Sequence, residues 1–219
     1  MDISNKALIK DKCYINGEWI NSYNKEIIEV NNPSTLKIIG KVPKCGKDET
    51  KYAISKANEA WNNWRNKTAI ERSILLKRWF NLIEKNKEDL AIIMTLEQGK
   101  PIAESRAEIS YGASFVEWFA EEAKRIYGDT IPDRFSDRRI IVLKQPIGVV
   151  AAITPWNFPS SMITRKCAPA LAVGCPVVIK PASQTPLSAL ALGVLAEEAG
   201  FPNGVINIIT GNAKEIGYE

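Results

Sequence analysis

The sequence contains no histidine and only four cysteines among its 219 residues. Without an imidazole, these residues alone cannot form a Ser-His-Asp site, a histidine general base or a zinc site with histidine ligands. The cysteines, at positions 13, 45, 167 and 175, also lack the Cys-x-x-Cys spacing of zinc ribbons and thioredoxin-like centres. We therefore expect no bound metal.

A large excess of charge and a secretion signal are missing too. The net charge is only +4, and no basic run exceeds three residues, so we expect no nucleic-acid partner. Residues 1–6 carry no apolar signal-peptide core, which together with the free thiols indicates a cytoplasmic protein. Residues 145–164 are uncharged and long enough to cross a bilayer. However, Pro146, Pro155 and Pro159 interrupt them, so we predict a buried strand and a turn, and no membrane partner.

Apolar residues make up 45% of the chain and charged residues 25%, which is typical of a globular protein. The front part predicts a β-hairpin around Asn16-Gly17, strands at residues 26–30 and 37–42, and then four helices. We expect these helices at about residues 54–64, 68–83, 87–98 and 101–127. Phe115, Trp118 and Phe119 recur at helical spacing; a ligand-binding cluster is conceivable, but we expect them to pack on the core.

The pattern changes after residue 144, because only eight charged side chains fall in residues 145–219. Apolar runs at 147–153, 176–179 and 205–209 alternate with helical segments at 160–173 and 187–199. Such alternation predicts a parallel sheet covered on both faces. Ligands bind such sheets at the carboxyl ends of the strands, which directs attention to residues 154–159, 180–186 and 210 onward.

These loops contain the candidate functional residues. Asn157 lies between two prolines, where its carboxamide could stabilise an oxyanion or merely cap the next helix. Lys180 ends an apolar strand, where it could hold a nucleotide, with the Ser183 hydroxyl nearby, or simply be solvated. Arg165 could grip a carboxylate or face solvent. Cys45 is flanked by lysines that could acidify its thiol, but we do not expect it to be a nucleophile.

Six segments, in this order and spacing, resemble the aldehyde dehydrogenase superfamily, and among its members the bacterial succinate-semialdehyde dehydrogenases. They are Leu-Glu-Gln-Gly-Lys-Pro at 96–101 and the segments 111–122, 144–149, 153–159, 162–166 and 180–186. The resemblance extends over nearly the whole chain. It implies an α/β protein with the N-terminal part of that fold, in which helices pack on a mostly parallel, Rossmann-like sheet that is incomplete.

The resemblance also implies a division of the chain. Residues 1–127 would form the hairpin and helical part of the cofactor-binding domain, residues 128–146 a strand extension for oligomerisation, and residues 147–219 the first βαβαβ part of the nucleotide-binding domain. A homo-oligomer, either a dimer or a tetramer, is implied for the full-length protein.

Roles for individual residues follow from the same resemblance. Asn157 would be the oxyanion donor, and Arg165 and Phe158 would contact an aldehyde substrate, succinate semialdehyde. NADP or NAD would be bound by nine residues: Ile153, Thr154, Pro155, Trp156, Asn157, Lys180, Pro181, Ala182 and Ser183. The position of Ser183 often carries Glu in members of the family that favour NAD, so NADP is expected to be accepted.

The family's catalytic thiol and general base have no counterpart in these 219 residues. The cysteine that follows Gly-Gln and the glutamate of a Leu-Glu-Leu-Gly-Gly segment are both absent. We therefore expect the chain alone to be inactive and to belong to a longer oxidoreductase. The alternative is a non-catalytic protein, derived from an aldehyde dehydrogenase, that binds a nucleotide or a partner subunit.

Overall fold

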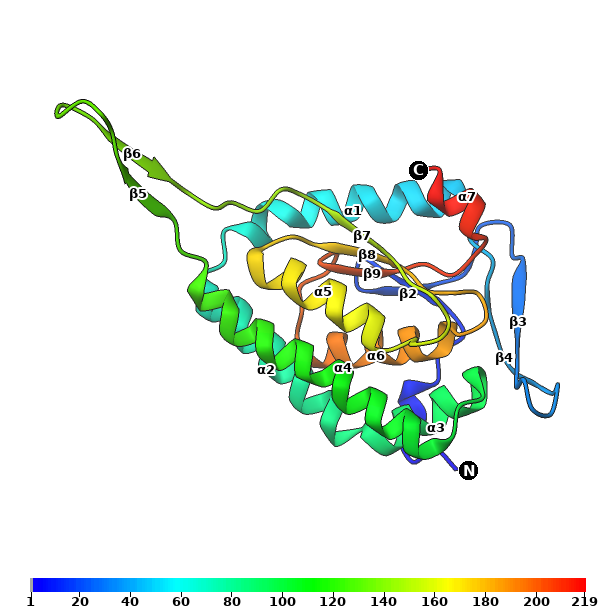
Figure 1. Cartoon of the computed structure of the whole chain (residues 1–219). Helices are drawn as coiled ribbons and strands as arrows, with labels where there is room; N and C mark the ends of the chain where they lie inside the picture. Colours follow the sequence, from blue (N-terminus) through cyan, green and yellow to red (C-terminus); the bar gives the residue numbers. More distant parts are fainter. Residues whose placement is uncertain (1) are drawn as a thin grey trace.

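A five-stranded sheet forms the centre of the protein, whose computed structural model describes residues 2–219 (Figure 1). Its strands lie in the order β2-β1-β9-β8-β7. They are β1 (Cys13–Ile15), β2 (Glu18–Ile20), β7 (Val150–Ile153), β8 (Val177–Lys180) and β9 (Ile206–Ile208). β7, β8 and β9 are parallel, as the tail of the sequence predicts, whereas the β1–β2 hairpin joins β9 in the antiparallel sense. The sheet is therefore mixed.

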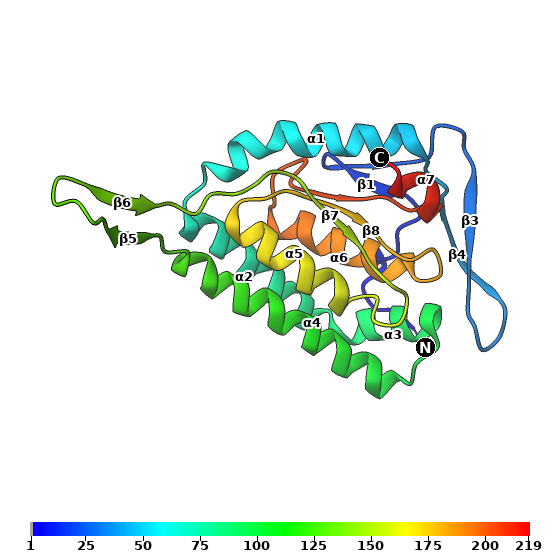
Figure 2. The same cartoon turned by 45° about the horizontal axis from the view of Figure 1, so that its top comes forward.

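Helices cover both faces of this sheet (Figure 2). On one face lies α1 (Lys47–Arg65), with the short α7 (Ala213–Gly217) beside it, and on the other lie α5 (Ser161–Val173) and α6 (Pro186–Ala199). An outer layer packs on α5 and α6; it consists of α2 (Ala69–Lys85), α3 (Lys87–Gln98) and α4 (Ile102–Glu122). Two single turns, η1 (Lys6–Leu8) and η2 (Ala123–Arg125), complete the helical part.

Local sequence signals account for several element boundaries. The β1–β2 turn uses positive φ angles at Asn16 and Gly17, which an Asn-Gly pair tolerates well. Thr68 accepts a hydrogen bond from the Glu71 backbone N–H, and Glu71 accepts one from Thr68 in return, so the predicted capping box begins α2. Gly99 ends α3 in the left-handed conformation. The predicted hairpin and helix ends are confirmed at these positions.

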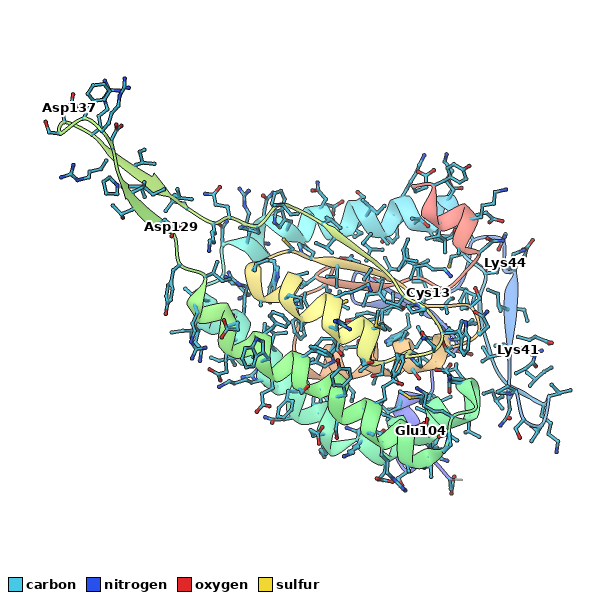
Figure 3. All side chains as sticks on the ribbon, in the orientation of Figure 1. Cys13, Lys41, Lys44, Glu104, Asp129 and Asp137 are labelled. Atoms are coloured by element: carbon cyan, nitrogen blue, oxygen red, sulfur yellow. The ribbon has the colours of Figure 1, made fainter. Side chains whose placement is uncertain are left out.

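Two further hairpins lie outside the central sheet. β3 (Ile27–Asn31) pairs with β4 (Ile38–Pro43), and β5 (Asp129–Pro132) pairs with β6 (Arg139–Val142). The β5–β6 hairpin projects far from the body, with Asp137 near its tip (Figure 3), and every residue of both strands is exposed. An isolated two-stranded hairpin has little stability of its own.

The prediction that Trp118 packs on the core is wrong. Trp118 is 64% exposed, and Phe115 and Phe119 are only partly buried. The face of α4 that meets the core carries smaller side chains: Ile109, Gly112, Ala113, Val116 and Ala120. The reason is close helix packing, because a Cβ atom at Gly112 would lie 3.2 Å from the Ser161 Cα of α5.

Residues 145–164, the uncharged stretch, form a loop, β7, a second loop and the beginning of α5. The prediction of a buried strand is wrong here, because β7 lies at the edge of the sheet and both Ala151 and Ile153 are exposed. Within residues 2–219, no helix is long and apolar enough to cross a membrane.

Candidate functional site

Three loops meet where the parallel strands end. The first loop (residues 154–160) follows β7, the second (residues 181–185) follows β8, and the third (residues 209–212) follows β9. The Thr154 N–H donates to the Lys180 carbonyl at 3.1 Å, and the Ser183 hydroxyl donates to the Gly211 carbonyl at 3.0 Å. These bonds link the first loop to the end of β8, and the second loop to the third.

The structure brings the predicted cofactor residues together at this edge. Ile153 ends β7 and is in register with Lys180, which ends β8. The rest of the set lies on the first and second loops: Thr154, Pro155, Trp156, Asn157, Pro181, Ala182 and Ser183. Phe158 lies on the first loop as well, and Arg165 lies one turn into α5.

Lys180 is not a solvated strand end. Its residue is only 5% exposed, and its ammonium forms no ion pair or hydrogen bond with any of residues 2–219. Burial lowers the pKa of this lysine, because the charged form loses hydration that nothing replaces. An anion bound at this edge would replace the lost hydration of the ammonium.

A second polar atom nearby also lacks a partner. The Thr154 hydroxyl is buried and makes no hydrogen bond with any described residue. Buried hydroxyls are normally hydrogen-bonded, so an orphan at a ligand-binding edge is informative. Lys180 and Thr154 together fit a polar, anionic ligand such as a dinucleotide.

Asn157 does not cap α5. The N-cap position is Ser160, and it makes no side-chain capping bond. The first N–H groups of the helix are already bound, because Glu108 of α4 accepts hydrogen bonds from the Ser160 and Ser161 N–H groups at 3.0 and 3.1 Å. The Asn157 side chain is exposed and hydrogen-bonds to no other described residue, while its backbone carbonyl accepts a 2.9 Å bond from Lys100. Its carboxamide is therefore free.

Arg165 is exposed and its guanidinium lies 5.5 Å from the centre of the Phe115 ring. No carboxylate within residues 2–219 pairs with it. Arg165 therefore faces solvent, which was one of the two possibilities left open by the sequence. Its guanidinium, which contacts the Phe115 ring, is free to bind a carboxylate.

The four cysteines are all reduced and buried. The Sγ atoms of Cys13 and Cys45 lie 3.4 Å apart, and this contact, with burial, raises the pKa of the Cys45 thiol rather than lowering it as its lysine neighbours suggest. Burial also raises the pKa of Cys167 to about 12. Residues 2–219 thus offer no accessible thiolate, and they hold no group of three or more residues suited to a metal ion.

Two residues at this site escaped the sequence reasoning. Lys100 and Glu108 form an ion pair that is almost completely buried and that touches the first loop. The available signal was the Gly-Lys-Pro end of the segment at 96–101, which places a lysine at a helix-to-helix corner. Nothing in the sequence indicates which loop this corner meets.

A sheet with three parallel strands and polar loops at their carboxyl ends defines an α/β protein with a ligand site at that edge. Comparison with known proteins is more specific: the aldehyde dehydrogenase family model matches residues 19–219. The chain therefore belongs to the aldehyde dehydrogenase family.

Individual relatives refine this assignment. A glutarate-semialdehyde dehydrogenase of Pseudomonas aeruginosa is 59% identical over 219 residues, and an NADP⁺-dependent succinate-semialdehyde dehydrogenase of Escherichia coli is 58% identical. Each alignment covers 100% of this chain and 45% of the relative. A crystal structure of an E. coli NADP-dependent enzyme superposes with a TM-score of 0.98 at 58% identity, covering 99% of this chain and 45% of the other. The chain thus spans less than half the length of these relatives.

Proposed function

We propose that these residues form the cofactor-binding and carboxylate-binding part of an NAD(P)-dependent dehydrogenase that oxidises succinate semialdehyde to succinate. The observation that carries the proposal is that Asn157, Arg165 and Lys180 lie on or near one sheet edge, and none of the three side chains is hydrogen-bonded or ion-paired within residues 2–219. The two relatives agree with this proposal, since succinate and glutarate semialdehydes both end in a carboxylate.

Each residue has a distinct role in this proposal. The nicotinamide cofactor, when bound, supplies the hydride acceptor. Lys180 holds its ribose or phosphate, and the orphan Thr154 hydroxyl gains a partner. Arg165 binds the distal carboxylate, with Phe158 beside the substrate. The Asn157 carboxamide donates to the oxygen that becomes negative when the aldehyde is attacked.

The attacking thiol and the general base are supplied by other residues of the complete enzyme, by which we mean these residues together with the rest of the dehydrogenase. The four cysteines support this division because all are buried. Hydrogen bonds from Cys45 and Thr210 lower the pKa of Cys13, but its sulfur is enclosed between Cys45 and Thr210 and is not accessible to a substrate. The purified 219-residue chain is expected to reduce neither NAD nor NADP in the presence of aldehyde. Aldehyde-dependent formation of reduced cofactor, followed at its absorbance band, would overturn this division.

We further propose that the chain consists of three parts with different roles. Residues 1–127 and 147–219 build the cofactor-binding part, and the arm at 128–146 joins subunits into a dimer or tetramer. The fully exposed β5–β6 hairpin supports the last role. The reduced cysteines support a cytoplasmic location.

A second candidate, a non-catalytic nucleotide-binding or subunit-interaction protein, is favoured by the same lack of an accessible thiol. The two candidates differ in what restores activity. The proposed dehydrogenase predicts that a polypeptide joining these residues to the complementary part of a relative oxidises succinate semialdehyde. A joined protein that binds NADP in calorimetry yet turns over no aldehyde would favour the second candidate.

A further inference from the structure

The corner between α3 and α4 contains a carboxylate that is buried and fully used. The Glu108 side chain is 2% exposed; one carboxylate oxygen accepts the Ser160 and Ser161 N–H groups, and the other pairs with Lys100. The carboxylate thus satisfies two backbone donors that the beginning of α5 leaves free, and it places negative charge at the positive end of that helix.

Lys100 connects this carboxylate to the first loop. Its side chain is 10% exposed, its ammonium donates to the Asn157 carbonyl at 2.9 Å, and it lies 4.5 Å from the centre of the Phe158 ring. One ammonium therefore meets a buried anion, a backbone carbonyl and an aromatic face. Each of these contacts compensates for part of its lost hydration.

The first loop is also held at its two ends, where the Thr154 N–H donates to the Lys180 carbonyl and the Ser160 N–H donates to Glu108. Between these ends, residues 155–157 form no hydrogen bond with the described part of the chain except the one from Lys100 to the Asn157 carbonyl. The side chains of Trp156 and Asn157 are exposed. The direction of the Asn157 carboxamide is thus set by a backbone that one side chain holds.

We propose that Lys100 and Glu108 are positioning residues that hold the first loop so that Asn157 presents its carboxamide to the reacting carbonyl oxygen. This inference rests on the role of Asn157 proposed above. Glu108 fixes the beginning of α5 and the ammonium of Lys100, and Lys100 fixes the backbone of Asn157. Orientation within the site controls rate steeply, since a displacement of roughly 1 Å can cost about 10²-fold.

The ion pair could instead serve stability alone, and a double variant separates the two roles. Lys100→Met keeps the aliphatic stem but leaves the Glu108 charge buried and unpaired, which should lower the unfolding midpoint by roughly 10 °C. Combining it with Glu108→Gln removes that charge and keeps an acceptor for the Ser160 and Ser161 N–H groups. The double variant should unfold near the wild-type midpoint, yet its bond to the Asn157 carbonyl is still missing.

Three measurements on the complete enzyme then decide. We expect Lys100→Met and the double variant to share a fall in kcat of about 10²-fold with little change in the KM for NADP. Both should also show residues 155–158 displaced or disordered in crystal structures. Glu108→Gln alone removes the anion that fixes Lys100, so it should lower kcat too, but by less than Lys100→Met, because Lys100 can still reach the Asn157 carbonyl. Arg106→Met is the matched control, because it breaks an exposed α3–α4 ion pair with Glu88 that touches neither loop; it should change nothing.

A double variant that regains wild-type kcat and the wild-type conformation of residues 155–158 would overturn the proposal and leave the pair a purely structural one. The same variants also distinguish the positioning role of Lys100 from the proposed role of Asn157 as oxyanion donor. If Asn157→Ala leaves kcat unchanged while Lys100→Met still loosens residues 155–158, the loop is held as proposed but Asn157 is not the oxyanion donor.

Discussion

The first and second loops are anchored by the same corner in different ways. α5, which follows the first loop, is capped by Glu108, whose charge is balanced by Lys100. α6, which follows the second loop, is capped by Glu97, which accepts hydrogen bonds from the Leu187 and Ser188 N–H groups at 2.7 and 2.8 Å. Within residues 2–219, no lysine or arginine pairs with Glu97.

This difference in charge balance has a consequence for the two loops. Burial raises the pKa of Glu97, which has no cation beside it, to about 7. The first loop is held by an ion pair. The loop proposed for the cofactor is held by a carboxyl group that titrates near neutral pH.

The largest expected effect lies on the substrate side. Replacing Arg165 by Leu in the complete enzyme removes the proposed partner of the substrate carboxylate. The transition-state stabilisation that kcat/KM for succinate semialdehyde measures should fall by about 2–5 kcal/mol, the range for losing one partner of a buried charge pair. An uncharged aldehyde of similar length is the control and should lose much less. Equal losses on both substrates would make Arg165 structural.

Asn157→Ala tests the first loop itself. Removing one oxyanion donor typically lowers turnover by about 10²–10³-fold, and we expect that loss in kcat of the complete enzyme. The carboxamide makes no hydrogen bond with residues 2–219, so the unfolding midpoint should not change. Turnover within threefold of wild type would refute the role.

The titration of Glu97 should make the stability of the protein depend on pH at the second loop. Its pKa rises on folding from 4.5 to about 7, so the folded state binds the proton more tightly. The resulting stabilisation is complete below pH 4.5, declines as the pH rises toward 7 and is absent above, a change of about 3 kcal/mol. Chemical denaturation of wild type and Glu97→Gln between pH 4.5 and 8 checks this. Between pH 4.5 and 7, wild type should lose about 3 kcal/mol of stability relative to Glu97→Gln, and parallel curves would contradict this.

Local patterns in the sequence predicted most of the fold. The Asn16-Gly17 turn and the Thr68–Glu71 capping box are contained within a few residues, and the strand–helix alternation after residue 144 needs only apolar periodicity. The candidate loops follow from that alternation, because parallel strands end at one edge.

What the sequence could not predict depends on contacts between distant residues. Glu108 and Ser160 are 52 positions apart, Lys100 and Asn157 are 57, and Glu97 and Leu187 are 90. Helical spacing also could not tell which face of α4 would meet α5, and so Trp118 was placed on the wrong side. Burial of Cys45 likewise outweighs the lysines beside it in sequence.

The smallest expected effect lies on the second loop, at Ser183. Its hydroxyl already donates to the Gly211 carbonyl. We expect serine to permit NADP mainly because it is not a carboxylate, which at about 4 Å would repel the 2′-phosphate by roughly 1–4 kcal/mol. Ser183→Glu in the complete enzyme should shift the ratio of kcat/KM values toward NAD by about tenfold or more. Ser183→Ala is the matched control: it loses the bond to Gly211 without adding charge and should keep the wild-type ratio. If both variants shift the ratio equally, the conformation of the loop sets the preference and its charge does not.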